Sequence, residues 1–191
     1  IIGGFFVCTD GITIAIILGF AILSIYFYST KIVDSGLGEF FVAVKGSMIV
    51  IGTFFIQSGE ISLESILAGI VVGSLSSLVL FIASFPDHDA DKSKGRKTLV
   101  ITVGKKRGAQ LFWIFSLVSY LAIIIGVSAN LFPLLSLISF FSIPLMIKSG
   151  IGLQKNYDSI ENLVPYMSST LMFGRITGVL FIVGFLIDSV T

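Results

Sequence analysis

Most of this chain consists of apolar runs long enough to cross a lipid bilayer, separated by short polar stretches. A membrane helix needs about 17 to 25 apolar residues, and six runs meet that length. They cover residues 11–28, 38–57, 64–85, 108–127, 130–147 and 167–187, with residues 1–8 resembling the end of a further span. Because lipid offers no partners for backbone N–H and C=O groups, the runs are predicted to be helices. We therefore expect an all-α, polytopic transmembrane helical bundle that forms a single domain over residues 1–191.

The composition supports a membrane protein. The chain is 55% hydrophobic and only 12% charged, whereas about a quarter of the residues in a soluble domain are charged. Its mean hydropathy is +1.05. The net charge of +1 gives no electrostatic signature of a nucleic-acid partner. Membrane lipid is the partner that the composition predicts.

The basic residues alternate from side to side along the predicted spans. Those outside the spans fall in the connections 29–37, 86–107 and 148–166, whereas the other connections and the C-terminus contain no Lys or Arg. Cytoplasmic loops of membrane proteins carry an excess of Lys and Arg. This pattern predicts that the Asp87–Arg107 loop is cytoplasmic.

The densest charge cluster lies in that loop. Asp87 and Asp91 are four residues apart, so on a helix they share one face and repel unless a cation lies between them. Carboxylate oxygens with substrate phosphate form the shell that Mg²⁺ prefers, and Lys92, Arg96 and Lys97 suit an anionic diphosphate. The alternative is an acidic helix end balanced by the basic residues that follow. We assign Asp87 and Asp91 as candidate metal ligands.

Four other charged or titratable positions need separate interpretations. Asp89 falls on a different helix face from Asp87, and His88 is the only histidine, so neither is expected to bind the metal directly. Lys45 and Arg175 lie inside predicted spans, where charges usually face a cavity or a partner. Lys45 either binds diphosphate or extends its ammonium to the membrane surface.

Small residues predict turns and close helix contacts. Asp10-Gly11, Gly36 to Gly38, Ser58-Gly59-Glu60 and Asn130 have the composition of turns. The pairs Gly69/Gly73 and Gly174/Gly178 have the spacing of close helix approach, a weak signal in a chain so rich in glycine.

The loop also resembles a known sequence motif. The run Asp87-x-x-x-Asp91-Lys92-x-x-Gly95-Arg96-Lys97-Thr98-Leu99, followed by Gly104, is similar to the second aspartate-rich motif of the UbiA superfamily of intramembrane prenyltransferases. It is most similar to the branch that prenylates 1,4-dihydroxy-2-naphthoate. Tyr28-Ser29, Gly36-Leu37-Gly38-Glu39 and Gln57-Ser58-Gly59 resemble that branch too, and the similarity covers roughly residues 25–110.

This resemblance implies a fold and an activity. The fold is a bundle of nine transmembrane helices around a cavity, with two aspartate-rich motifs that bind Mg²⁺ and the diphosphate of a polyprenyl donor. The activity is transfer of the prenyl chain to an aromatic acceptor in quinone biosynthesis. Asp87 and Asp91 would be the metal pair, and Lys92, Arg96 and Lys97 the diphosphate-binding residues. Thr98 and Glu39 match the family without a clear role, whereas Lys45 does not match a family position.

The first family motif, of the form NDxxDxxxD, does not occur in the sequence. We expect it upstream of Ile1, and we expect the chain as given to be inactive because half of the metal site would be missing. Two other readings are a non-catalytic membrane scaffold of the same fold and a membrane transporter. A transporter predicts acidic residues within the spans, whereas here the aspartates lie at a helix end.

Overall fold

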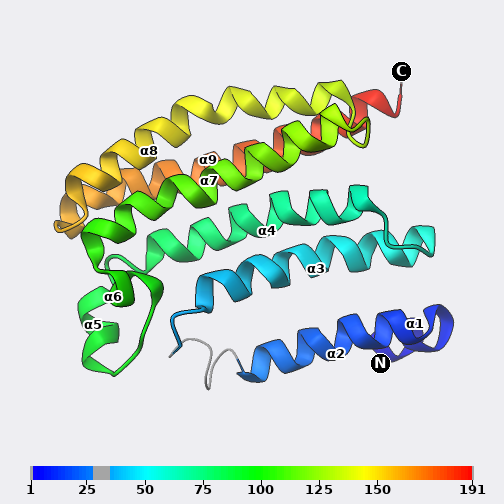
Figure 1. Ribbon diagram of the computed structural model, residues 1–191, viewed down its shortest axis with the longest axis horizontal. Helices are drawn as coiled ribbons and strands as arrows, with labels where there is room; N and C mark the ends of the chain where they lie inside the picture. Colours follow the sequence, from blue (N-terminus) through cyan, green and yellow to red (C-terminus); the bar gives the residue numbers. More distant parts are fainter. Residues whose placement is uncertain (1, 28–34, 191) are drawn as a thin grey trace.

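The protein is helical throughout the part described by the computed structural model, which covers residues 2–27 and 35–190. Figure 1 shows the helices packed side by side along one axis, with two short helices at one end. The elements are α1 (Ile2–Asp10), α2 (Ile12–Phe27), α3 (Gly38–Ser58), α4 (Leu63–Ala83), α5 (His88–Ser93), α6 (Leu99–Val103), α7 (Lys105–Ser128), the 3₁₀ helix η3 (Leu134–Ser142), α8 (Ile143–Asn156) and α9 (Ile160–Asp188). The prediction of an all-α polytopic bundle is confirmed.

Five elements are long and apolar enough to cross a membrane. They are α3, α4, α7, η3 together with α8, and α9. The first predicted span corresponds to α2, which has 16 residues and is shorter than these five. The expected turns at Gly11, Gly59 and Asn130 are present, since each of these residues has positive φ.

The last two spans differ from the predicted bounds. The span predicted at 130–147 runs from Leu134 to Asn156, and the one predicted at 167–187 runs from Ile160 to Asp188. Lys148 and Lys155 therefore lie in α8 rather than in a connection. Both side chains are exposed, and a long basic side chain can extend its charge beyond the apolar region without ending the helix.

Buried hydroxyls mark the junction between η3 and α8. Ser142 Oγ lies 2.7 Å from Tyr120 Oη of α7 and 2.7 Å from Thr177 Oγ1 of α9. Pro144 follows within the first turn of α8, where its missing N–H has no intrahelical partner to lose. The three hydroxyls thus join η3 to both neighbouring helices at the point where 3₁₀ geometry changes to α geometry.

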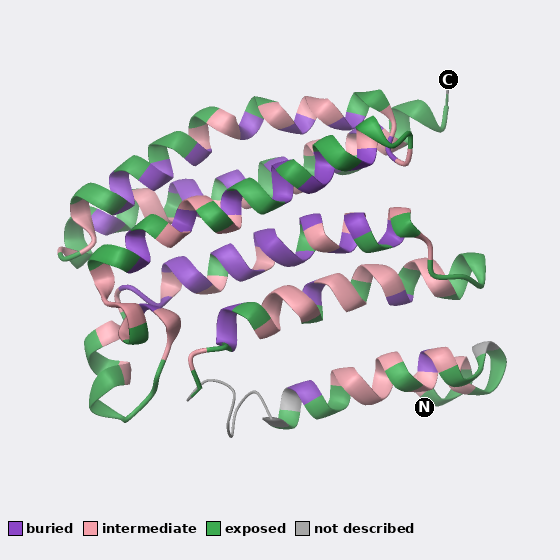
Figure 2. Ribbon diagram, in the orientation of Figure 1, coloured by how far each residue is buried: buried purple, intermediate pink, exposed green. Residues whose placement is uncertain are grey.

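The core is centred on α4, which packs against α3, α7 and α9. Phe81, Phe112 and Phe173 are fully buried there. Figure 2 shows that buried positions dominate α4, whereas α2 and α3 are mostly intermediate or exposed. Exposed apolar side chains of this kind suit a lipid environment.

Small residues bring α3 and α4 into close contact. A Cβ added at Gly46 would come within 2.9 Å of the Gly73 Cα, and one added at Gly69 would come within 3.0 Å of the Ser47 carbonyl oxygen. The predicted close approach at Gly69/Gly73 is confirmed. No close approach is found at Gly174/Gly178 within residues 2–27 and 35–190, since an added Cβ at either glycine would meet none of their atoms within 4 Å.

The charged loop between α4 and α7 lies at one end of the bundle. It contains α5 and α6, and the α8–α9 connection lies at the same end (Figure 1). Lys105, Lys106 and Arg107, predicted to be in the loop, form the first turn of α7. Gly104, with φ of +85°, separates α6 from α7.

Candidate active site

The two candidate metal ligands lie one helical turn apart. Pro86 follows the buried Phe85 and has no N–H with which to continue α4. Asp87 then occupies the N-cap position of α5 without a side-chain capping bond, and the Asp91 N–H donates to the Asp87 carbonyl over 2.8 Å. The Asp87 side chain is exposed, whereas that of Asp91 is only 13% exposed. The pair therefore presents two carboxylates on successive turns at the end of the bundle.

Arg96 folds back onto Asp91. The chain reverses at Gly95, where φ is +76°, a conformation that glycine adopts without a steric cost. Arg96 N–H then donates to the Asp91 carbonyl over 3.0 Å. Its Nη1 lies 2.9 Å from Asp91 Oδ1. The loop thus places a guanidinium directly beside one of the two predicted metal ligands.

Three further lysines lie on the same loop. Lys92, Lys94 and Lys97 are exposed, and none forms an ion pair with a residue that the structure describes. Their ammonium groups are free to meet an anion from outside the loop. Of the residues predicted to bind diphosphate, Lys92, Arg96 and Lys97 therefore lie on the same loop as the two aspartates.

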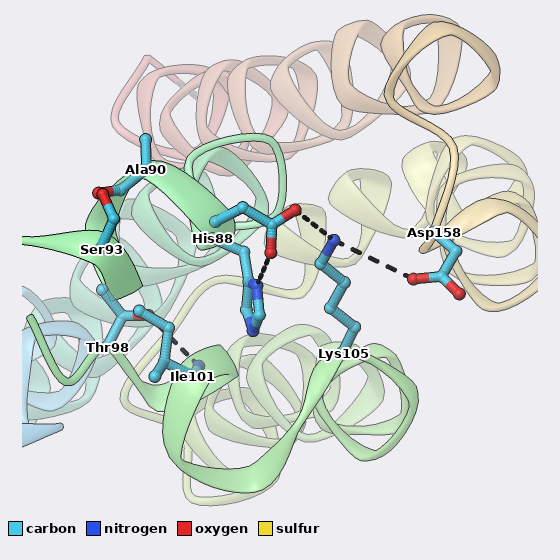
Figure 3. Close-up of polar contacts among 8 residues, drawn as sticks. His88, Ala90, Ser93, Thr98, Ile101, Lys105 and Asp158 are labelled. Carbon is cyan, nitrogen blue, oxygen red and sulfur yellow. Dashed lines mark hydrogen bonds and ion pairs between the residues drawn. The ribbon is translucent and has the colours of Figure 1, made fainter.

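A second charged cluster connects α5 to the rest of the bundle. His88 Nδ1 lies 2.7 Å from Asp89 Oδ1 (Figure 3). Lys105 Nζ at the start of α7 lies 3.3 Å from Asp89 Oδ2 and 3.9 Å from Asp158 Oδ1 in the α8–α9 connection. The His88 side chain, and after it the Lys105 ammonium, hold the pKa of the Asp89 carboxyl below its ordinary value. Asp89 therefore serves to hold α5 against α7.

The segment before α3 packs against the loop as well. Glu39 is 3% exposed. It lies in the first turn of α3, and its Oε2 has no hydrogen-bond partner among residues 2–27 and 35–190. A Cβ at Gly36 would lie 3.3 Å from the Lys97 carbonyl oxygen and 3.2 Å from Thr102 Oγ1. Two of the segments that carry the family resemblance are thus in contact.

Comparison with known proteins identifies the family. The model of the UbiA prenyltransferase family matches residues 1–186. The chain belongs to the UbiA prenyltransferase family. The resemblance inferred from the Asp87–Leu99 run is confirmed.

Its relatives include naphthoate prenyltransferases. The chain is similar to 1,4-dihydroxy-2-naphthoate octaprenyltransferase of Bacillus subtilis (strain 168), with 28% identity over 97% of this chain and 61% of that protein. It is 29% identical to the Haemophilus influenzae protein of the same name over 80% of this chain and 49% of that protein. It is also 26% identical to 2-carboxy-1,4-naphthoquinone phytyltransferase of Synechocystis sp. over 57% of this chain and 36% of that protein.

The chain therefore spans less than two thirds of the length of the curated relatives it matches. No solved structure matches it significantly.

The donor set of this UbiA family member can be compared with what Mg²⁺ requires. Within residues 2–27 and 35–190, no three His, Cys, Asp or Glu side chains gather into a metal site. Asp87 and Asp91 supply hard carboxylate oxygens at the loop, where the third carboxylate, Asp89, is already paired with His88 and Lys105. That set fits Mg²⁺, which is commonly bound by one or two carboxylates and retains water or substrate phosphate in its remaining positions.

The other residues that were predicted for the site, or that carry the family resemblance, lie outside the charged loop. Lys45 is in α3, two turns beyond Gly38; its side chain is exposed and forms no ion pair with a described residue. Arg175 is likewise exposed in α9. Gln57 lies in the last turn of α3. At a rise of 1.5 Å per helical residue, that is roughly 30 Å from the end of α3 nearest the loop. Tyr28-Ser29 lies outside the described residues.

Sequence reasoning missed the burial of Glu39 and the contact of Lys105 with Asp89. It left the role of Glu39 open, and it treated Lys105 only as a basic residue of the loop. The burial of Glu39 was signalled only by its position beside an apolar run, and nothing local indicates that Lys105 meets Asp89, 16 residues earlier.

Proposed function

We propose that this protein is an intramembrane prenyltransferase that moves an isoprenoid chain from a polyprenyl diphosphate to an aromatic acceptor. The acceptor is 1,4-dihydroxy-2-naphthoate or a close analogue, and the product is an intermediate of quinone biosynthesis. The family membership and the names of the similar proteins support this assignment. The observation that carries the site is the loop itself, where three carboxylates and four basic side chains lie between α4 and α6.

In this proposal the loop binds the diphosphate end of the donor. Asp87 and Asp91 would hold Mg²⁺, which when bound supplies Lewis-acid stabilisation of the charge that develops on the departing diphosphate. Lys92, Arg96 and Lys97 bind the diphosphate oxygens. Arginine suits this role because its planar fork of N–H groups matches phosphate oxygens. Arg96 already lies beside the metal ligand Asp91, with its Nη1 2.9 Å from Asp91 Oδ1.

In the reaction, the allylic carbon exchanges its bond to the diphosphate oxygen for a bond to the acceptor ring. The C–O bond between the isoprenoid and the diphosphate breaks, and its electron pair leaves on the diphosphate. The electron-rich acceptor ring attacks the allylic carbon through one of its ring carbons. That ring carbon then releases the substituent it carried before, and the electron pair of the broken bond stays in the ring. The loop favours this step by stabilising negative charge where it develops, which is commonly the largest catalytic contribution.

Lys45 remains a candidate diphosphate ligand. Its place in α3, on the same helix as Glu39 and near the loop end of the bundle, supports the assignment. The charge distribution supports a cytoplasmic position for the Asp87–Arg107 loop, because the connections at the opposite end contain no Lys or Arg.

The direct test is a transfer assay in membranes that contain the protein expressed from its complete gene. Polyprenyl diphosphate, Mg²⁺ and either 1,4-dihydroxy-2-naphthoate or 4-hydroxybenzoate are supplied, and prenylated products are identified by mass spectrometry. We expect a Mg²⁺-dependent prenylated naphthoate that control membranes do not make. Product from 4-hydroxybenzoate alone would refute the acceptor, and no product from either would favour the scaffold or the transporter.

A further inference from the structure

Lys105 is a largely covered cation between two acids from distant parts of the chain. Its side chain is 18% exposed. Its Nζ lies 3.3 Å from Asp89 Oδ2 of α5 and 3.9 Å from Asp158 Oδ1 of the α8–α9 connection (Figure 3). Lys105 therefore joins three elements that are separate in the sequence: α5, α7 and the α8–α9 connection.

The position of Lys105 on its helix makes these acids necessary. Lys105 is the first residue of α7, where the partial positive charge of the helix N-terminus opposes a further positive charge. A mostly covered ammonium is also costly unless it is paired. The two acids offset both costs, so this cluster differs from an isolated surface ion pair, which contributes little to stability.

The short helix α5 depends on this cluster for its orientation. It has six residues, fewer than a helix needs to be stable alone, and each of them is exposed or half-buried. Core packing therefore does little to fix α5. Asp89 uses both of its carboxylate oxygens, Oδ1 toward His88 and Oδ2 toward Lys105. The ion pair with Lys105 is thus a contact that fixes α5 relative to α7.

The orientation of α5 determines where the two candidate metal ligands point. Asp89 lies two residues from Asp87 and two from Asp91, which is about 200° around a helix from each. Asp87 and Asp91 therefore share the face of the turn opposite that of Asp89. Holding Asp89 against α7 thus sets the direction in which the other two carboxylates face.

We propose that Lys105 is a positioning residue for diphosphate binding, which fixes α5 to α7 and to the α8–α9 connection and so orients the Asp87 and Asp91 carboxylates. This extends the site to the connection between α8 and α9, which lies outside the segments that carry the motif resemblance. The link to diphosphate rests on the proposed function, whereas the link between the three elements rests on the ion pairs alone. The two links are therefore tested by separate measurements.

Proteolysis tests the link between the three elements. Trypsin cleaves after Lys and Arg, and the exposed residues Lys92, Lys94, Arg96 and Lys97 offer it four sites in the loop. The protein is expressed from its complete gene and placed in lipid nanodiscs. Initial cleavage rates at these four sites, measured by mass spectrometry, report how often the loop opens.

The decisive variant lies in the α8–α9 connection rather than in the loop. Asp158→Asn should raise the cleavage rates about twofold, because Lys105 loses one of its two acids. It should raise them no further in a Lys105→Met background, where the shared partner is already absent. Lys105→Arg keeps the cation and should stay close to the wild type. The matched control is Glu161→Gln, which removes an exposed acid from the first turn of α9 and should leave the rates unchanged.

A second measurement tests the link to diphosphate without relying on turnover. Inorganic pyrophosphate with Mg²⁺ has the charged group of the donor, and by binding to the folded loop it should protect the loop from trypsin. The concentration of magnesium pyrophosphate that halves the cleavage rate should rise about threefold in Lys105→Met and stay at the wild-type value in Glu161→Gln. In the transfer assay the KM for polyprenyl diphosphate should rise by a similar factor, and Lys105→Arg should restore it.

The outcomes separate this proposal from the proposed function. If Asp158→Asn leaves the cleavage rates unchanged, or accelerates cleavage equally with and without Lys105, the joining of the three elements is refuted. If magnesium pyrophosphate protects Lys105→Met at the wild-type concentration, the positioning role is overturned. If it does not protect the wild type at all, the proposed diphosphate site and its positioning by Lys105 are both refuted, while the effect of Asp158→Asn still decides the structural link.

Discussion

Replacing Gly73 with alanine should separate α3 from α4. An added Cβ would meet the Ala43 carbonyl oxygen and would lie 2.5 Å from Ser47 Oγ. The backbone oxygen cannot move aside as a flexible side chain does, so α3 must shift. The shift strains the bond that Ser47 Oγ donates to the Gly69 carbonyl across the helix pair, now 2.9 Å.

The expected loss of stability follows from three contributions. Overpacking a close contact costs about 1–3 kcal/mol, and an interhelical hydroxyl bond in a membrane is worth about 0.6 kcal/mol. Alanine favours a helix over glycine by about 1 kcal/mol, which offsets part of this. Gly73→Ala should therefore lower the free energy of unfolding by about 0.6–2.6 kcal/mol.

The matched control is Gly178→Ala in α9, where an added Cβ would meet no atom of the described part of the chain within 4 Å. It should be neutral, or more stable by up to about 1 kcal/mol. Both free energies are measured by equilibrium unfolding in mixed dodecyl maltoside and SDS micelles, followed by circular dichroism. If Gly73→Ala were as stable as Gly178→Ala, the close packing of α3 on α4 would be refuted.

Three further predictions concern the charged cluster and the hydroxyl junction. Lys105→Met removes the cation between Asp89 and Asp158 and should speed tryptic cleavage after Lys92 to Lys97 by a few fold; an unchanged rate would show that the cluster does not hold the loop. The Asp89 carboxyl should titrate below its ordinary pKa of 3.8. Its pairs with His88 and Lys105 should therefore persist above pH 3.8 and be lost as the pH falls through the lowered pKa. A midpoint at or above 3.8 in a carboxyl-carbon NMR titration would contradict this. Tyr120→Phe removes one hydroxyl of the junction and should cost about 0.6–1.7 kcal/mol in the same micelle assay, whereas a stabilised variant would contradict the account.

Hydropathy predicted the helical content and the approximate place of each span because lipid leaves a long apolar run no alternative to a helix. It did not predict the ends of α8 and α9. Lys148 suggested the end of a span, yet an exposed lysine on a helix surface carries its charge on a flexible stem. Helix ends of this kind depend on side-chain reach rather than on local composition.

The sequence predicted only part of the candidate site, because it shows the spacing of neighbouring residues but not the contacts between distant ones. The spacing of Asp87 and Asp91 is a local property, so the sequence predicted that they lie one helical turn apart, as they do at the N-cap and in the first turn of α5. The contacts of Ser77 Oγ with the Glu39 carbonyl and of Asp89 with Lys105 join residues far apart in sequence. They depend on the packing of α3 and α7 around α4, which no local pattern encodes.

The loop aspartates are the centre of the account, and their effect on turnover tests it most directly. Rates of Mg²⁺-dependent prenyl transfer to 1,4-dihydroxy-2-naphthoate should be compared for the wild type, Asp87→Asn and Asp91→Asn. Glu60→Gln, an exposed acid just beyond the opposite end of α3, serves as the control. Each asparagine keeps the shape of the side chain and removes the charge that Mg²⁺ requires. The account predicts that both aspartate variants lose transfer while the control retains it, and near-normal turnover in either variant would contradict it.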